Sequence, residues 1–73
     1  MKISMHVDNR FYQITVSDDF TERKALLTRF KGQSKWSVRG RMHDDDGMFK
    51  IELGTMTKQN ALFAARLFVI GGI

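Results

Sequence analysis

The sequence predicts an α+β fold, in which a four-stranded antiparallel sheet carries two helices on one face. Residues 2–7 and 11–16 alternate between apolar and polar side chains, and residues 35–42 and 48–53 do so again. Each of these pairs of segments is followed by a segment with helical apolar spacing. The expected order is therefore β-β-α-β-β-α in a single domain of residues 1–73.

The first two segments predict a hairpin with a two-residue turn at Asp8 and Asn9. Such a turn places Met5 opposite Tyr12 and gives the hairpin one apolar face and one face that is polar apart from Phe11. The apolar face consists of Ile3, Met5, Val7, Tyr12, Ile14 and Val16. We expect this face to lie beneath the helices.

A first helix is expected over residues 20–31. Asp19 can accept hydrogen bonds from the free amides at the helix start, and Glu22 can reach back to the amide of the cap residue. The apolar side chains of this segment fall roughly on one side, and Gly32 supplies a left-handed residue at its end. The pattern is typical of a three-turn amphipathic helix.

The second hairpin pairs Met42 with Phe49 across an acidic turn, which places Val38 opposite Leu53. Gly40 lies on its apolar face. The missing side chain there either admits an aromatic side chain from a helix or marks a β-bulge. The apolar face consists of Trp36, Val38, Met42, Phe49, Ile51 and Leu53. The core is expected to include Ile3, Met5, Tyr12, Ile14, Val38, Phe49 and Ile51.

A second helix is expected from an N-cap at Thr57 to about Ile70, with Gly71 ending it. This segment is apolar nearly all round, which is unusual for a helix on the surface of a monomer. A homodimer would cover its second side through Leu62, Phe63, Leu67, Phe68 and Ile70. The alternative is a monomer in which the first helix and the loops wrap around the second helix.

The sequence predicts no catalytic residue, no metal site and no cofactor. His6 and His43 have no metal-ligand spacing to other candidate ligands, and the chain has no cysteine. The acidic turn Asp44–Asp46 does not match an EF-hand loop, because the twelfth position would be Leu53 rather than glutamate. We therefore expect neither an enzyme nor a protein that takes a small-molecule substrate.

No membrane contact is expected either. The longest apolar-rich stretch, Ala61 to Ile73, has 13 residues, whereas a membrane-spanning helix needs about 20. The segment Met1 to Ser17 alternates between apolar and polar residues and lacks the continuous apolar core of a signal peptide. Together with the absence of cysteine, these features favour the cytoplasm.

The whole chain has 12 lysines and arginines against 8 acidic residues. The positive charge is concentrated in the middle of the chain. Between Glu22 and Asp44 there is no acidic residue, while seven cations occur there. These are Arg23, Lys24, Arg29, Lys31, Lys35, Arg39 and Arg41. Such a block is typical either of a solvated surface, with Arg39 paired to Glu52, or of a surface that binds a polyanion.

Arg39 and Arg41 are two residues apart on one strand, so both project from the same sheet face. Their spacing of about 6.5–7 Å is close to that of successive phosphates along an extended backbone. The candidate binding surface consists of Lys31, Lys35, Arg39, Arg41, Lys50 and Phe11, with Phe11 available for stacking.

Nucleic acid or an anionic protein surface is the expected partner of this surface. The function predicted is that of a small, basic, non-enzymatic regulatory protein acting on nucleic acid or on a nucleic-acid-handling complex such as the transcription machinery. The alternative is an inhibitor or adaptor that binds a host protein, of the type that phages and mobile genetic elements encode.

Overall fold

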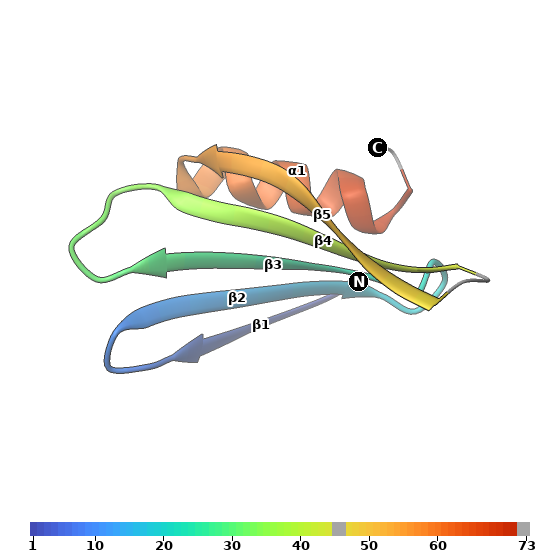
Figure 1. Ribbon diagram of the computed structural model, residues 1–73, viewed down its shortest axis with the longest axis horizontal. Helices are drawn as coiled ribbons and strands as arrows, with labels where there is room; N and C mark the ends of the chain where they lie inside the picture. Colours follow the sequence, from blue (N-terminus) through green and yellow to red (C-terminus); the bar gives the residue numbers. More distant parts are fainter. Residues whose placement is uncertain (45–46, 72–73) are drawn as a thin grey trace.

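The computed structural model describes residues 1–44 and 47–71, with the backbone alone at residues 43, 44 and 47–49. Within these residues, five strands in consecutive order form one antiparallel sheet, and one helix lies on one of its faces (Figure 1). The elements are β1 (Lys2–Val7), β2 (Phe11–Asp18), β3 (Arg23–Phe30), β4 (Trp36–Asp44), β5 (Gly47–Met56) and α1 (Lys58–Val69).

The expected helix over residues 20–31 is wrong, because Arg23–Phe30 forms strand β3. The sheet therefore has five strands and the fold has one helix, instead of four strands and two helices, although the α+β class still describes it. β3 is hydrogen-bonded to β2 on one side and to β4 on the other. Pairing on both edges outweighs the local helix propensity of its arginine, lysine, alanine and leucine residues.

The expected helix start is a turn between β2 and β3. The Asp18 carboxylate accepts a hydrogen bond from the Phe20 amide at 2.9 Å, and the Asp18 carbonyl accepts one from the Glu22 amide at 3.0 Å. Glu22 has a φ of 56°, in the left-handed region that closes the turn. An acidic side chain bonds to amides two or three residues ahead in turns as well as in helix caps, so the sequence signal is shared.

The first hairpin has the expected faces in a different register. β1 pairs with β2 so that Met5 lies opposite Ile14, not opposite Tyr12. The two-residue turn lies at Asn9 and Arg10, one residue later than expected, and the amide of Asp8 donates to the carbonyl of Phe11 across it at 2.9 Å. Because the register differs from the expected one by two residues, each side chain stays on its expected face.

The second hairpin confirms the pairing of Met42 with Phe49 but not that of Val38 with Leu53. A register shift between Val38 and Arg39 places Val38 opposite Gly54. Gly54 has a φ of 113°, a conformation that glycine adopts without strain. Leu53 is the extra residue on β5, and an extra residue of this kind generally increases the local twist of a hairpin.

The core lies between α1 and the sheet. Thr57 is the N-cap of α1, as expected, and its side chain accepts a hydrogen bond from the Asn60 amide at 3.4 Å. The ring of Phe68 packs at Gly40, so the expectation that this glycine admits a helix aromatic is confirmed. The buried side chains are Ile14, Val16, Ala25, Leu27, Trp36, Val38, Ala61, Ala65, Phe68 and Val69.

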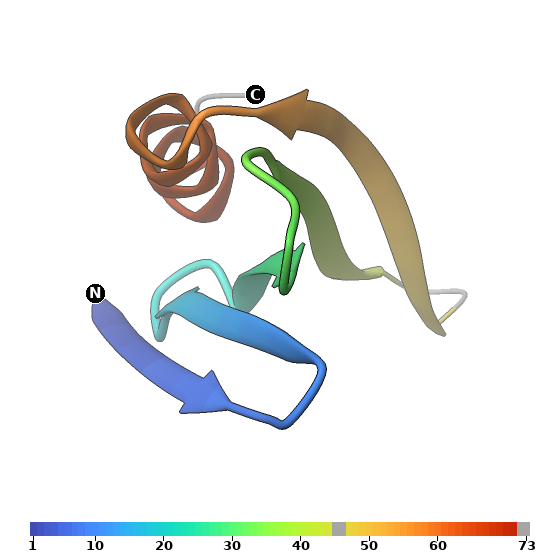
Figure 2. The ribbon, with the colours of Figure 1, turned by 90° about the vertical axis from the view of Figure 1, so that its left-hand side faces the viewer.

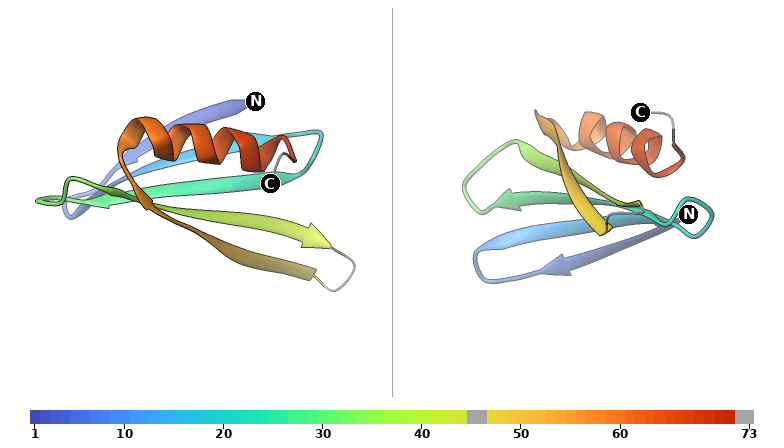
Figure 3. Two further views of the ribbon diagram at one scale, coloured as in Figure 1. Left: turned by 90° about the horizontal axis from the view of Figure 1, so that it is seen from above. Right: turned by 45° about the vertical axis from the view of Figure 1, so that its right-hand side comes forward.

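The apolar side of β1 lies outside this core, contrary to the expectation for Ile3 and Met5, which are 49% and 56% exposed. The reason is that α1 contacts β2, β3, β4 and β5 but not β1 (Figure 2). The view from above shows α1 running along the sheet (Figure 3). With the expected first helix absent, nothing in the described part of the chain covers this side of β1. Phe49 is another expected core residue, and the structure describes its backbone alone.

Candidate nucleic-acid interface

The sheet face opposite α1, here called the open face, has no helix on it in the described part of the chain (Figures 1 and 2). Side chains alternate between the two faces along each strand. In β3, Ala25 and Leu27 are buried beneath α1, so Lys24 and Phe30 belong to the open face. By the same alternation Arg39 and Arg41 of β4 lie on the open face.

Four cations form a row across the open face, because their strands are in register. Arg41 is the pairing partner of Lys24 on β3 and of Lys50 on β5. Ser17 of β2 continues the same row to Lys2 on β1. Neighbouring strands are about 4.8 Å apart, so the backbones at the three cations of β3, β4 and β5 span about 10 Å. We call Lys2, Lys24, Arg41 and Lys50 the cation row.

The side chains of the cation row have no close partner of opposite charge among the described residues. None of the four side chains forms an ion pair or hydrogen bond there, and the Nε of Arg41 is buried without an acceptor. Like charges directly opposite each other in a sheet are destabilising. An anion bound across β3, β4 and β5 would remove this repulsion.

Glu52 places a carboxylate on the open face, because it is the pairing partner of Arg39. Its Oε2 lies 3.2 Å from the Nε of Arg39, and both side chains are well exposed. The ion pair that the solvated-surface interpretation expects is thus present. It withdraws Arg39 from the set of free cations, so the charge of the open face is carried mainly by the cation row.

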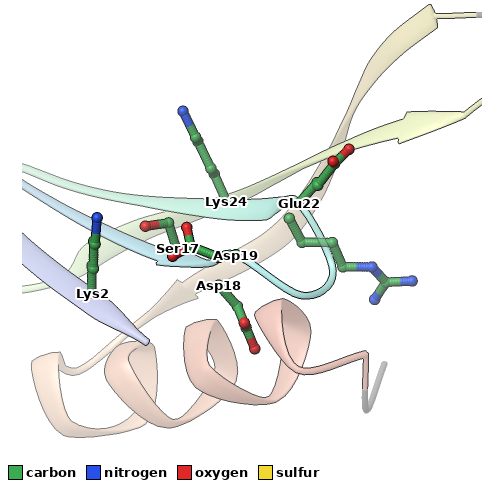
Figure 4. Close-up of a pocket in the computed structure, with 7 residues that line it drawn as sticks. Lys2, Ser17, Asp18, Asp19, Glu22 and Lys24 are labelled. Atoms are coloured by element: carbon green, nitrogen blue, oxygen red, sulfur yellow. The ribbon is translucent and has the colours of Figure 1, made fainter.

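A pocket of mixed charge lies at the end of the sheet where β2 turns into β3 (Figure 4). It is lined by Lys2, Ser17, Asp18, Asp19, Glu22, Arg23 and Lys24. Lys2 and Lys24 extend to one side of the sheet, whereas Asp18 points towards α1 (Figure 4). The carboxylates of this pocket are unfavourable for an anion placed between Lys2 and Lys24.

An aromatic pair lies at the opposite end of the open face. Phe11 and Phe30 are pairing partners on β2 and β3, with ring centroids 6.0 Å apart and an angle of 62° between the rings. This edge-to-face arrangement is favourable for two rings. Phe30 is 53% exposed, so part of the pair is accessible from solvent.

The structure places four of the six residues of the predicted binding surface on the same sheet face. Arg39, Arg41, Lys50 and Phe11 lie on the open face. The two others do not. The Nζ of Lys31 lies 5.6 Å from the centroid of the Tyr12 ring, on the helix side of the sheet. Lys35 is exposed in the loop between β3 and β4.

Two other cations of the acid-free segment between Glu22 and Asp44 lie on the side of the sheet that α1 covers. The guanidinium of Arg29 lies 4.8 Å from the centroid of the Tyr12 ring and 5.6 Å from that of Trp36, and its Nη1 donates to the Gln33 carbonyl at 2.6 Å. Arg23 lies 5.1 Å from the centroid of the Phe68 ring and donates to the Phe68 carbonyl at 3.0 Å. Cation–π and hydrogen-bond contacts of this kind support the fold, so the basic block is divided between two faces.

Sequence reasoning missed Lys2, Lys24 and Phe30. For Lys24 and Phe30 the cause is the helix expected over residues 20–31, which hid the alternation of β3. Lys2 lies on β1, and its row with Lys24 depends on the pairing of β2 with β3. Lys24, Leu26, Thr28 and Phe30 occupy one face of β3. The alternation of lysine, threonine and phenylalanine with the buried positions was the signal that could have identified them.

The predicted dimer residues are divided as well. Phe63 and Ile70 are 65% and 53% exposed, and Leu62 and Leu67 are half-buried. Phe68 is buried in the core and does not belong to the outer surface of α1. The side of α1 that remains apolar and accessible is therefore formed mainly by Phe63 and Ile70.

No group of three or more histidine, cysteine, aspartate or glutamate residues in the described ranges could hold a metal ion. Most of the acidic turn, residues 45 and 46, and the side chain of His43 lie outside the described residues. No helix within residues 1–44 and 47–71 has the length and apolar character needed to cross a bilayer. The chain matches no protein-family model, no curated protein and no solved structure.

Proposed function

We propose that this protein is a small, basic, non-enzymatic binding protein that acts on nucleic acid, or on a nucleic-acid-handling complex such as the transcription machinery, through its open face. The observation that carries this proposal is the row of cations at Lys24, Arg41 and Lys50, which are in register and form no ion pair with the described residues. Cations fixed on a rigid sheet displace counterions from phosphates, which is the main source of affinity for nucleic acid. The cytoplasm is the compartment that we propose for this activity.

Contacts of this kind position a phosphate backbone without reading the bases. The cation row therefore supports binding of many sequences with similar affinity. Direct readout would need side chains that reach base edges in a groove. We propose weak sequence preference for this protein.

A salt titration of oligonucleotide binding tests the proposal. The double variant Lys24→Gln, Arg41→Gln removes two cations from the cation row, and fluorescence anisotropy of a labelled oligonucleotide measures its affinity. Each phosphate contact contributes about 0.7 to the slope of log K against log salt on single strands, so we expect the slope to fall by about 1.4. The affinity of the wild type is expected to decrease steeply as salt increases.

The matched control is the double variant Lys58→Gln, Arg66→Gln, which removes the same charge from exposed positions of α1. We expect its slope to equal that of the wild type. If the control loses as much as the variant in the cation row, binding depends on net charge alone and the open face is not the interface. Wild-type protein without salt-dependent binding would refute the proposed function.

A second candidate function, a protein-binding inhibitor or adaptor, is favoured by strand β1. β1 is an edge strand, and Ile3, Met5 and Val7 expose an apolar side that α1 does not cover. An extended segment of another protein could add to this edge as a further strand, with apolar side chains beside Met5. The test is capture of a partner protein after nuclease treatment. This candidate is supported if the wild type and the double variant Lys24→Gln, Arg41→Gln capture the same protein and Met5→Lys does not.

A further inference from the structure

We infer that the nucleic acid bound on the open face is single-stranded and runs along β3 and β4, from the cation row to the ring pair of Phe11 and Phe30. This inference rests on the proposed function and specifies its substrate. The starting observation is that the cations and the rings occupy opposite ends of the same face. A ligand that contacts both must follow the strands rather than cross them.

The separation of the two ends suits a few nucleotides. Lys24 and Phe30 are six residues apart on β3, or about 20 Å along the strand. This distance corresponds to three steps of about 6.5–7 Å, which is also the approximate spacing of phosphates in an extended strand. About four nucleotides would therefore extend from a phosphate at Arg41 to a base at Phe30.

The surface between the two ends is made of short polar side chains together with Leu26 and Arg39. Thr28 is paired with Gln13 on one side and with Ser37 on the other, which provides hydroxyl and amide groups across three strands. Such groups can donate to phosphates or to base edges without standing above the sheet. The path along β3 is thus open to an extended chain.

The ring pair favours a single strand over a duplex. The flat faces of bases inside a duplex are covered by the neighbouring bases, so only unpaired bases can stack on an aromatic side chain. Phe30 is more than half exposed and lies in the sheet surface, where an unpaired base can reach it. Stacking on such a ring tolerates all four bases, in agreement with weak sequence preference.

A duplex would use a smaller part of the same face. The β4–β5 hairpin could enter a major groove as a two-stranded ribbon and bring Arg39, Arg41 and Lys50 to the DNA. That arrangement gives no role to Lys24 on β3 or to the ring pair on β2 and β3. The single strand accounts for both, and for this reason the observations favour it.

The test compares oligothymidylates of about 2, 4 and 8 nucleotides with a duplex of about 12 base pairs, using the wild type and Phe30→Leu. We expect affinity to rise sharply between the two shorter lengths. Phe30→Leu is expected to weaken binding of the two longer oligothymidylates about tenfold while leaving the duplex and the salt slope unchanged. Phe63→Leu on α1 is the matched control, and Phe11→Leu is the second variant should Phe30→Leu unfold.

The outcomes separate this inference from the proposed function. Duplex binding as tight as that of the longest oligothymidylate, with no effect of Phe30→Leu or Phe11→Leu, would overturn the single-strand path while the cation row kept its role. Loss of affinity in the Phe63→Leu control equal to that in Phe30→Leu would also overturn it. Absence of binding to every oligonucleotide would refute both proposals.

Discussion

The ring of Phe68 fills the space above Gly40. A Cβ atom placed on Gly40 would lie 2.5 Å from Cζ of that ring, closer than any normal contact between carbon atoms. Phe68 is the largest of the fully buried side chains, and it comes from α1, whereas Gly40 lies in the middle of β4. The position of the helix on the sheet therefore depends on the absence of a side chain at residue 40.

Replacement of Gly40 by alanine is expected to destabilise the protein by about 1–3 kcal/mol, because overpacking of a filled core forces the ring or the helix to move. Urea denaturation followed by circular dichroism measures the change. In the background Phe68→Leu the smaller side chain leaves room, so the added cost of Gly40→Ala is expected to shrink. Equal costs in the two backgrounds would show that the ring does not restrict residue 40.

Ile14 and Ile3 provide a test of which strands the helix covers. Ile14 is 4% exposed and Ile3 is 49% exposed. We expect Ile14→Ala to cost about 2–5 kcal/mol by leaving a cavity, and Ile3→Ala to cost less than about 1 kcal/mol. Thermal and urea unfolding measure both. Similar losses from the two substitutions would mean that β1 belongs to the core after all.

Arg23 and Thr21 both form hydrogen bonds to the C-terminal end of α1. The guanidinium of Arg23 donates to the Phe68 carbonyl, and the hydroxyl of Thr21 donates to the Val69 carbonyl. We expect Arg23→Met to cost about 1–2 kcal/mol and to speed amide exchange in the last helical turn. Lys24→Met, an exposed neighbour on the other face, is the control, and an equal effect there would contradict the assignment.

Neutralising Glu52 is expected to strengthen binding of oligonucleotides. Glu52→Gln removes a carboxylate from the open face and frees Arg39, which is paired to it at 3.2 Å. One additional phosphate contact would increase the salt slope by about 0.7. The stability cost is expected to stay below about 1 kcal/mol, because both members of the pair are well exposed. Weaker binding of this variant would argue against phosphate contacts near Arg39.

Self-association through the outer side of α1 remains a prediction that sedimentation can test. Phe63 and Ile70 are exposed apolar side chains seven residues apart, and thus on the same side of the helix. We expect the wild type to sediment at micromolar concentration with twice its mass of 8.5 kDa, and Phe63→Lys with the single mass. A wild type that stays at the single mass would reject the dimer.

The two hairpins and the C-terminal helix could be predicted because their signals are local. Alternation identified β1, β2, β4 and β5, and a threonine before an apolar run identified the start of α1. Strand β3 could not be predicted in this way. Its central residues, Ala25, Leu26 and Leu27, are three consecutive apolar residues that fit a helix as well as a strand. Only pairing with both neighbouring strands decides between the two.

The residues of the candidate site are also divided into those that local signals predict and those that depend on strand β3. The sequence predicts Arg39, Arg41 and Lys50 on one face because the expected register of the second hairpin matches the observed one from Arg39 to Lys50. Lys24 and Phe30 depend on β3, so neither could be assigned before that strand was known. Lys31 was assigned to the site from the charge count alone, and a charge count does not tell which face of a sheet a lysine occupies.

The consecutive order of the strands also bears on how the chain folds. Within residues 1–44 and 47–71, each strand is hydrogen-bonded to its neighbours in sequence and to no other strand, so every pairing closes a short loop. Hairpins of this kind form in about 1–10 μs, and loop-closure entropy opposes them little. The helix is different, because the contact between Thr21 and Val69 joins residues 48 positions apart. The order of assembly that these loop lengths favour is a sheet that grows hairpin by hairpin, with its apolar side exposed to water until α1 docks upon it.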